Sequence, residues 1–100
     1  MERSPSLHPS LDQLRRQAKD LLRDQRAGDA NAIARCRAHP RLARLADPDL
    51  RVATLSLSDA QLIVARECGL ASWPRLKRHV EDRERVEERL SRLRANFAAA

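Results

Sequence analysis

The stretch that decides the fold is "LSLSDAQLIVARECGLASWPRLKRHVE", residues 55–81, in which a short apolar segment lies on each side of Gly69. Within each segment, apolar residues recur at intervals of three or four, which is the period of an amphipathic helix. Gly69 can take the left-handed conformation that ends the first helix, and Ser72 can cap the second. Pro74 then falls in a first turn, where amides have no helical acceptor. The stretch predicts a helix-turn-helix-like pair over residues 58–80.

The composition of the whole chain indicates an all-α class. Its 100 residues suggest one domain, and 42% of them are apolar but only 2% are aromatic. Two glycines, no tyrosine and few β-branched residues argue against a sheet. The core must therefore consist of Leu, Ala, Val and Ile, and we expect Trp73 at its centre because few other residues supply bulk. We expect a small bundle of four to six helices with a long C-terminal helix.

The N-terminal half contains two helix starts. Ser10 stands three residues before a glutamine, the spacing of a capping box, and helical periodicity follows over about 11–27. Gly28 is placed to end this helix in the left-handed conformation. Asp29 can cap a second helix, which stops before Pro40.

The segment over residues 41–57 is less regular. Pro48 interrupts its apolar pattern, which predicts a short turn or two of helix on each side of the proline. Residues 54–57 are expected to be extended over the core. Ser58 with Gln61 repeats the spacing of a capping box and predicts the start of the next helix.

The last helix, from Trp73 to about residue 97, carries two apolar stripes. The six residues from Val80 to Val86 rotate the apolar face by about 120°. One straight helix cannot point both stripes at the same core, so either the chain bends near 82–84 or the second stripe faces a partner chain. The first stripe consists of Trp73, Leu76 and Val80, and the second of Val86, Leu90, Leu93 and Phe97.

The chain divides by pattern into three parts. Residues 1–9 carry Pro5 and Pro9 among polar neighbours and are expected to form a flexible lead. Residues 10–81 are the helical module, and residues 82–100 are a helical extension and interaction segment. No stretch approaches the ~18 apolar residues of a membrane span, and no apolar signal region precedes the module. We therefore expect a cytoplasmic protein with reduced cysteines.

The charge pattern keeps a nucleic-acid alternative open. A net charge of +6 attracts phosphate, yet each half of the chain carries ten basic and seven acidic residues, interspersed. In the usual register of a DNA-reading pair, Arg75 and Arg78 would be buried without partners, and the cost of several kcal/mol excludes that register. A shifted turn would instead expose them to phosphate. The residues of this alternative DNA-binding surface are Lys19, Arg75, Lys77 and Arg78.

Residues that could ligate a metal are few and scattered. Cys36 and His39 have a spacing found in zinc sites, and Cys68 with His79 would complete a set of four. Cys36, however, falls on the apolar face of its helix, where a free cysteine is a small buried hydrophobe. No motif of a phosphate-binding loop, a metalloprotease or a nucleophile elbow occurs. We predict no metal, no cofactor and no enzymatic activity.

Several short blocks occur in an order known from other proteins: Leu14 to Gly28 with Ala18-Lys19, then Asp59-Ala60-Gln61-Leu62, Ala65-Arg66-Glu67 and Ser72-Trp73-Pro74. Over residues 7–81 the chain resembles the N-terminal helical module of bacterial proteins that continue into ankyrin repeats or other appended domains. The resemblance implies a helical scaffold or interaction module with no known catalytic residues. This chain departs from the pattern at Cys68, where an aromatic residue or histidine is usual, and nothing after Glu81 resembles a repeat.

These patterns together predict a bacterial-type, cytoplasmic, non-enzymatic module that binds a protein. The partner is either another protein or a second copy of the chain, without membrane or metal. The alternative function is DNA binding through the pair over residues 58–80. The expected protein interface consists of Val86, Leu90, Leu93 and Phe97.

Overall fold

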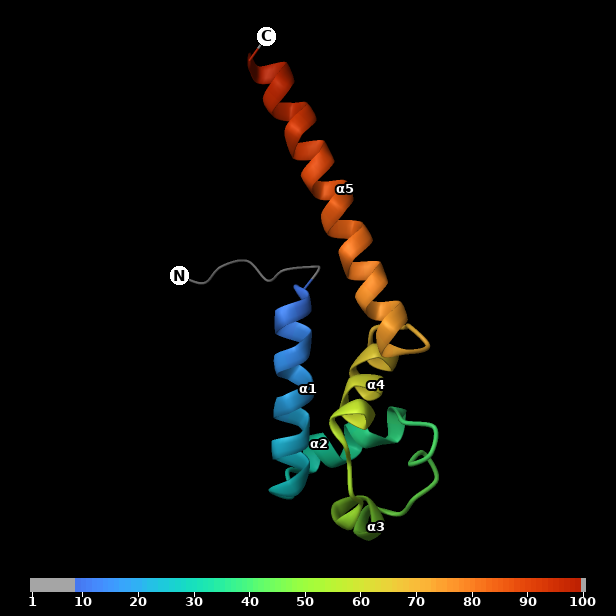
Figure 1. The fold of residues 1–100 in the computed structure, drawn as a ribbon. Helices are drawn as coiled ribbons and strands as arrows, with labels where there is room; N and C mark the ends of the chain where they lie inside the picture. Colours follow the sequence, from blue (N-terminus) through green and yellow to red (C-terminus); the bar gives the residue numbers. More distant parts are fainter. Residues whose placement is uncertain (1–8, 100) are drawn as a thin grey trace.

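The computed structural model describes residues 9–99, with side chains as far as residue 96. The predicted flexible lead over residues 1–9 therefore lies, apart from Pro9, outside the described residues. The described part of the chain contains α-helices and one 3-10 turn but no strand, which confirms the all-α class with a long C-terminal helix (Figure 1). The elements are α1 (Leu11–Arg26), α2 (Ala30–Arg35), the 3-10 turn η1 (Cys36–Ala38), α3 (Asp47–Val52), α4 (Leu57–Glu67) and α5 (Trp73–Ala99).

The core lies where α1, α4 and the first half of α5 pack together, with α2, η1 and α3 closing the end away from α5 (Figure 1). Its side chains are aliphatic or small, as the composition requires. Two polar side chains, those of Gln25 and His39, are buried among them. The largest fully buried side chains include Leu14, Leu21, Leu50, Ile63 and Val80.

The first helix begins and ends as the sequence predicts. Ser10 Oγ accepts a hydrogen bond from the Gln13 amide at 3.2 Å, and Gln13 Oε1 accepts one from the Ser10 amide at 2.8 Å. This reciprocal capping box satisfies two amides that have no helical acceptor. Gly28 follows with a φ of +81°, a conformation that a side chain would strain. Asp29 then caps α2 by accepting from the Ala32 amide at 2.9 Å.

The predicted capping box at Ser58 is wrong. α4 begins at Leu57, and its cap is Ser56, whose Oγ accepts from the Asp59 amide at 3.1 Å. Asp59 in turn accepts from the Ser56 amide at 3.0 Å. A carboxylate is a stronger acceptor than an amide and is favoured at the positive end of a helix, so the register that uses Asp59 prevails over the one that uses Gln61.

The prediction of helical turns on both sides of Pro48 is also wrong. Residues 40–44 form only turns, and Pro48 itself lies in the first turn of α3. Proline fits there because the N–H it lacks would have no helical acceptor. Residues 53–56 are not helical, with extended backbone at Ala53 and Ser56, so the expected extended segment is present, although Leu57 belongs to α4.

Trp73 packs against the core but does not form its centre, contrary to expectation. Its side chain is only partly buried, whereas Leu76 and Val80 on the same helix are 2% and 1% exposed. Trp73 is the first residue of α5, directly after the turn over residues 68–72. At this edge of the bundle few elements remain to cover a large ring. The turn itself matches the prediction, with Gly69 at a φ of +85°.

α5 is one uninterrupted helix that leaves the bundle. Val80 is its last buried residue, Arg83 is partly buried, and every described residue from 84 to 96 is exposed. In Figure 1 this half of the helix extends alone beyond the other elements. The radius of gyration is 17.5 Å, against about 13 Å for a compact domain of this length. The helix passes 82–84 without a break, so the second stripe does not face the core of its own module.

Candidate protein-interaction surface

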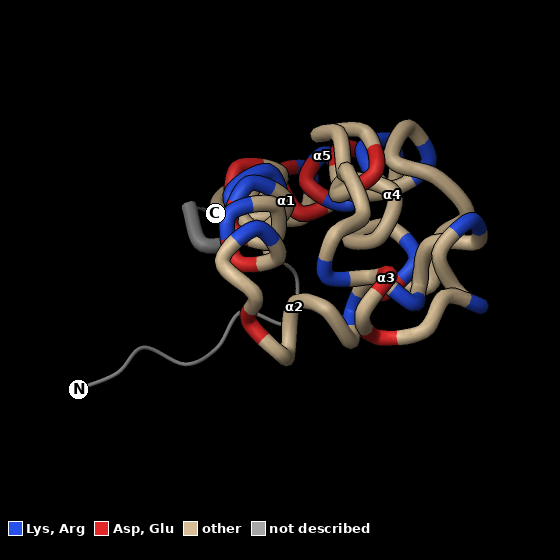
Figure 2. Tube along the Cα trace, turned by 90° about the horizontal axis from the view of Figure 1, so that it is seen from below, with Lys and Arg blue, Asp and Glu red and all other residues tan. Residues whose placement is uncertain are grey.

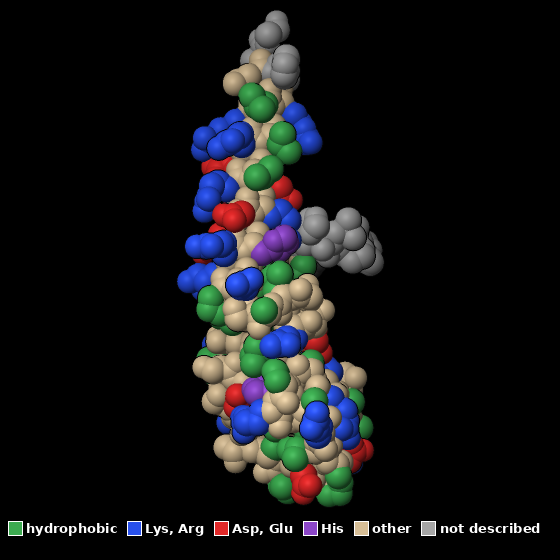
Figure 3. All heavy atoms as spheres, turned by 90° about the vertical axis from the view of Figure 1, so that its right-hand side faces the viewer, with side chains coloured by type: hydrophobic (Ala, Val, Ile, Leu, Met, Phe, Trp, Pro, Cys, Tyr) green, Lys and Arg blue, Asp and Glu red, His purple; other side chains and the backbone are tan. Residues whose placement is uncertain are grey.

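The candidate site is the apolar row along the projecting half of α5. Val86, Leu90 and Leu93 are 55%, 46% and 48% exposed. Their spacing of four and then three residues places them on one face of the helix, and we call these three residues the distal stripe. Phe97, the fourth predicted member, has a side chain outside the described residues. Figure 3 shows hydrophobic side chains spaced along this part of the helix among charged ones.

Charged residues surround the distal stripe. Away from it, Arg92 donates a hydrogen bond to Glu88 at 2.8 Å, so these two charges satisfy each other within the helix. Directly beside the stripe lie Glu87 and Arg94 on one side and Arg89 on the other. Within the part of the chain that the structure describes, these three residues form no ion pair. Their charges are therefore available to a partner chain.

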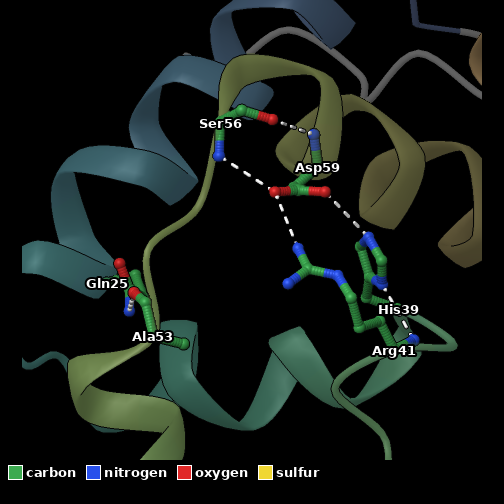
Figure 4. Close-up of polar contacts among 6 residues, drawn as sticks. All are labelled: Gln25, His39, Arg41, Ala53, Ser56 and Asp59. Carbon is green, nitrogen blue, oxygen red and sulfur yellow. Dashed lines mark hydrogen bonds and ion pairs between the residues drawn. The ribbon is translucent and has the colours of Figure 1, made fainter.

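A polar network fixes α4, against which the base of α5 packs. Asp59 accepts hydrogen bonds from His39 Nε2 at 2.9 Å and from the Arg41 guanidinium at 3.1 Å, besides the Ser56 amide (Figure 4). The backbone amide of Arg41 donates to His39 Nδ1 at 3.0 Å. Since the Arg41 amide donates to Nδ1, it is Nε2 that carries the hydrogen accepted by Asp59.

The electrostatics of this network keep Asp59 ionised. Burial alone would raise the pKa of Asp59, but hydrogen bonds from Ser56, His39 and Arg41 outweigh it, and the net pKa is lowered. The charged carboxylate thereby joins the start of α4 to the turns that follow η1.

Two further polar contacts hold the ends of the helices. The Nε2 of Gln25 donates to the carbonyl oxygen of Leu50 at 3.0 Å. It also donates to the carbonyl oxygen of Ala53 at 2.9 Å (Figure 4), and the two hydrogen bonds join α1 to the end of α3. Arg35 on α2 binds Glu67, the last residue of α4, through two hydrogen bonds of 2.9 and 2.8 Å. The hydrogen bond with Glu67 raises the pKa of Arg35 above its usual value. The pair Arg35–Glu67 thus fixes the end of α4, from which the turn into α5 departs.

The residues of the nucleic-acid alternative are all exposed, but only some lie together. Arg75 and Arg78 line one shallow depression of about 460 Å³ with Asp82, whose carboxylate lowers the positive potential there. Lys77 lies on the same half of α5, and Lys19 lies on α1, outside the lining of that depression. Figure 2 shows basic residues on helices and connecting turns alike, with acidic residues among them on α1 and α5.

The four residues with zinc-like spacing in the sequence do not come together as one group of ligands in the described residues. No three His, Cys, Asp or Glu side chains in the described ranges are grouped so that they could hold a metal ion. Cys36 is buried, with its Sγ 3.3 Å from the carbonyl oxygen of Ala32, whereas Cys68 is exposed. Burial raises the pKa of the Cys36 thiol, and partial desolvation together with the charge of neighbouring Glu67 raises the pKa of Cys68, so both thiols are poor nucleophiles at neutral pH.

A small cleft lies between the beginning of α1 and the first half of α5. It measures about 240 Å³ and is lined mainly by apolar residues. The partly buried Arg83 lies at this cleft, where its guanidinium donates to the Pro9 carbonyl at 3.4 Å and its Nε has no partner among the described residues. The volume is below the roughly 300 Å³ at which small-molecule pockets begin, so the cleft does not point to a ligand.

Comparison with known protein families, with curated proteins and with solved structures found no match for this chain. The resemblance to the helical module of ankyrin-repeat proteins therefore stays a prediction. In the residues that the structure describes, no helix combines the length and the apolar character needed to cross a bilayer. The function is accordingly inferred from the distal stripe and the charges beside it.

Proposed function

We propose that this chain is a small non-enzymatic helical module that binds another protein chain through the distal stripe. The observation that supports this proposal is the exposure of Val86, Leu90 and Leu93 on a helix that projects from its own core. Apolar side chains in a row are the usual contact surface of a helix that packs against a partner. The packed module then serves as the base from which the helix projects.

The free energy of burial favours covering the distal stripe. Complete burial of one such side chain stabilises by about 1.5–3 kcal/mol. Since each of the three is already about half covered, a partner would gain roughly 1 kcal/mol from each. The projecting half of α5 also lacks tertiary contacts. An isolated helix of this length is only marginally stable in water. A partner helix would supply the contacts that are missing.

The test is photocrosslinking in the organism that encodes the chain. A photoreactive residue replaces Leu90 in the distal stripe or, as the matched control, Ala95, which is exposed on the opposite face of the same helix. We expect a discrete crosslinked protein adduct from position 90 and much less from position 95. Equal yields at the two positions, or no adduct at position 90, would contradict the proposal.

A second candidate function is nucleic-acid binding, supported by the exposed pair Arg75 and Arg78 at one depression. Guanidinium groups placed together are suited to phosphate contacts. Asp82 in the same depression opposes an anion, which favours the protein-binding function over this one.

A further inference from the structure

We infer that the partner of the distal stripe is a second copy of this chain, and that the two projecting helices lie antiparallel. This inference rests on the proposed function, because it names the partner of the same surface. It is carried by the charges beside the distal stripe, and by the exposure of every described residue from 84 to 96, which leaves the whole projecting segment accessible.

The distal stripe has the spacing of a seam between two helices. Its members are four and then three residues apart, and position 97 continues the pattern, so they alternate between the two seam positions of a seven-residue repeat. Glu87 and Arg94 are seven residues apart and occupy equivalent positions beside this seam. Arg89 occupies the position on the other side, as does Asp82 one repeat earlier. Residues in these flanking positions meet across a two-helix interface and decide which orientation is stable.

Antiparallel pairing brings opposite charges together. In the register where Leu90 of one copy packs against Leu93 of the other, all the seam positions from 86 to 97 overlap. Glu87 then lies across the seam from Arg94 of the second copy, and symmetry repeats this pair. On the other side of the seam, Arg89 meets an uncharged asparagine at position 96. Two opposite-charge pairs and no like-charge contact therefore border this interface.

The other arrangements bring like charges together. In a parallel pair, Asp82 would face Glu87 of the second copy and Arg89 would face Arg94, and symmetry doubles both contacts. Shifting the antiparallel register by one repeat places Glu87 opposite its own copy, and the opposite shift does the same for Arg94. Like charges facing each other oppose association. The sequence thus selects one orientation and one register.

The dimer should be weak. Only four seam positions of each chain meet, so the interface falls at the small end of specific interfaces, where complexes are transient. We expect dissociation in the micromolar range or weaker, and a dimer that forms when the chain is concentrated or held locally.

Charge reversal tests the pairing of Glu87 with Arg94 across the seam. Analytical ultracentrifugation of the full chain measures the dissociation constant of the dimer. Glu87→Arg alone and Arg94→Glu alone should each weaken the dimer about tenfold, because each turns two attractive contacts into repulsive ones. Glu87→Arg with Arg94→Glu in one chain should restore the wild-type affinity. Mixing the two single variants should give a heterodimer in preference to either homodimer. Glu84→Arg, which changes the same charge away from the seam, is the control and should leave the affinity unchanged.

The orientation of the two helices is tested by the distance between spin labels on the two copies. A spin label on Lys77→Cys in a Cys68→Ser background lies on the exposed base of α5, and Cys36 stays buried and unlabelled. In the antiparallel register the two labelled positions are 29 residues apart along the helices, or about 43 Å at 1.5 Å per residue. A parallel pair would place the backbones of the labelled positions about 10 Å apart, the spacing of neighbouring helices.

Each outcome decides between the possibilities. A chain that remains monomeric at about 0.5 mM would contradict the inference that the partner is a second copy. The proposed function would then be tested by the crosslinked adduct at position 90 alone. A dimer with a short label distance, or with no preference for the mixed pair, would overturn the antiparallel arrangement. A preferred heterodimer with the long distance supports the inference.

Discussion

A single buried amide joins the end of α1 to the segment that precedes α4. Gln25 is 2% exposed, and its Nε2 donates to the carbonyl oxygens of Leu50 and Ala53 at 3.0 and 2.9 Å. Both carbonyl groups lie at the end of α3, where the last carbonyl groups of a helix lack amide donors from the next helical turn. Leaving a buried polar group without a partner costs about 1–3 kcal/mol, so this side chain matters more for its hydrogen bonds than for its bulk.

We expect Gln25→Leu to lower the free energy of unfolding by about 1–3 kcal/mol, although leucine is apolar and similar in size. The reason is that the carbonyl oxygen of Ala53 loses its side-chain donor, and that of Leu50 keeps only the Ala53 amide at 3.4 Å. Gln17→Leu, at an exposed position of the same helix, should change the free energy by about 0.5 kcal/mol or less. Urea denaturation measures both. Equal effects of the two substitutions would show that the buried amide contributes packing alone.

Asp59 makes the stability of the chain depend on pH. Burial alone would raise the pKa of Asp59, but its hydrogen bonds lower it below the unfolded value of about 3.9. The stabilisation is therefore present above about pH 4 and is lost as the pH falls through the folded pKa. We expect Asp59→Asn to lose stability at neutral pH and then to lose less than the wild type on acidification. Chemical denaturation across this range, with the exposed Glu84→Gln as control, measures the difference, and parallel curves for wild type and Asp59→Asn would refute it.

The helix ends show which elements local sequence can predict. The cap at Ser10 is predicted correctly because one serine alone has the required spacing to a helical acceptor there. Ahead of α4, both Ser56 and Ser58 have it, and local spacing does not choose between them. Besides the acceptor strength of its carboxylate, Asp59 gains hydrogen bonds from His39 and Arg41, which lie 20 and 18 residues away in the sequence. Contacts between residues this far apart in the sequence cannot be predicted from local residue spacing.

The two ends of α5 illustrate the same limit. The exposure of the distal stripe follows from the sequence, because the helical period fixes which residues share a face and a rotation of about 120° removes the stripe from the core. The partial burial of Trp73, by contrast, cannot be predicted from the sequence pattern. It depends on which elements surround the start of α5, and the period of the helix carries no information about them.

The distal stripe should contribute to association and not to folding. Since residues 84–96 are exposed, Leu90→Asp with Leu93→Asp should change the free energy of unfolding of the module by less than about 1 kcal/mol while removing association. The matched control is Ser91→Asp with Ala95→Asp, which adds the same charge to the same helix away from the stripe. Thermal unfolding and light scattering on each variant provide the readouts. Global unfolding of the stripe variant alone would mean that these residues belong to the core of the chain.

The whole molecule combines an elongated shape with a mixed charge. Its extents are 63 × 32 × 16 Å, and the longest of these is due to the projecting helix (Figure 1). The net charge is +6, with ten basic and seven acidic residues in each half of the chain. Electrostatic attraction of nucleic acid requires a face of one sign, whereas interspersed charges cancel over about 10 Å at moderate salt. The overall charge therefore favours solubility more than it favours phosphate binding.

This charge distribution predicts weak, salt-sensitive binding to duplex DNA. Arg75 and Arg78 can each neutralise one phosphate, so the logarithm of affinity should fall with the logarithm of salt concentration with a slope of about −2. Asp82 in the same depression repels the backbone, and binding should vanish near physiological salt. Fluorescence anisotropy with a labelled duplex over a salt series measures both. Submicromolar affinity at about 0.15 M salt, lost in Arg75→Ala with Arg78→Ala but kept in the exposed control Arg16→Ala, would establish DNA binding as the function instead.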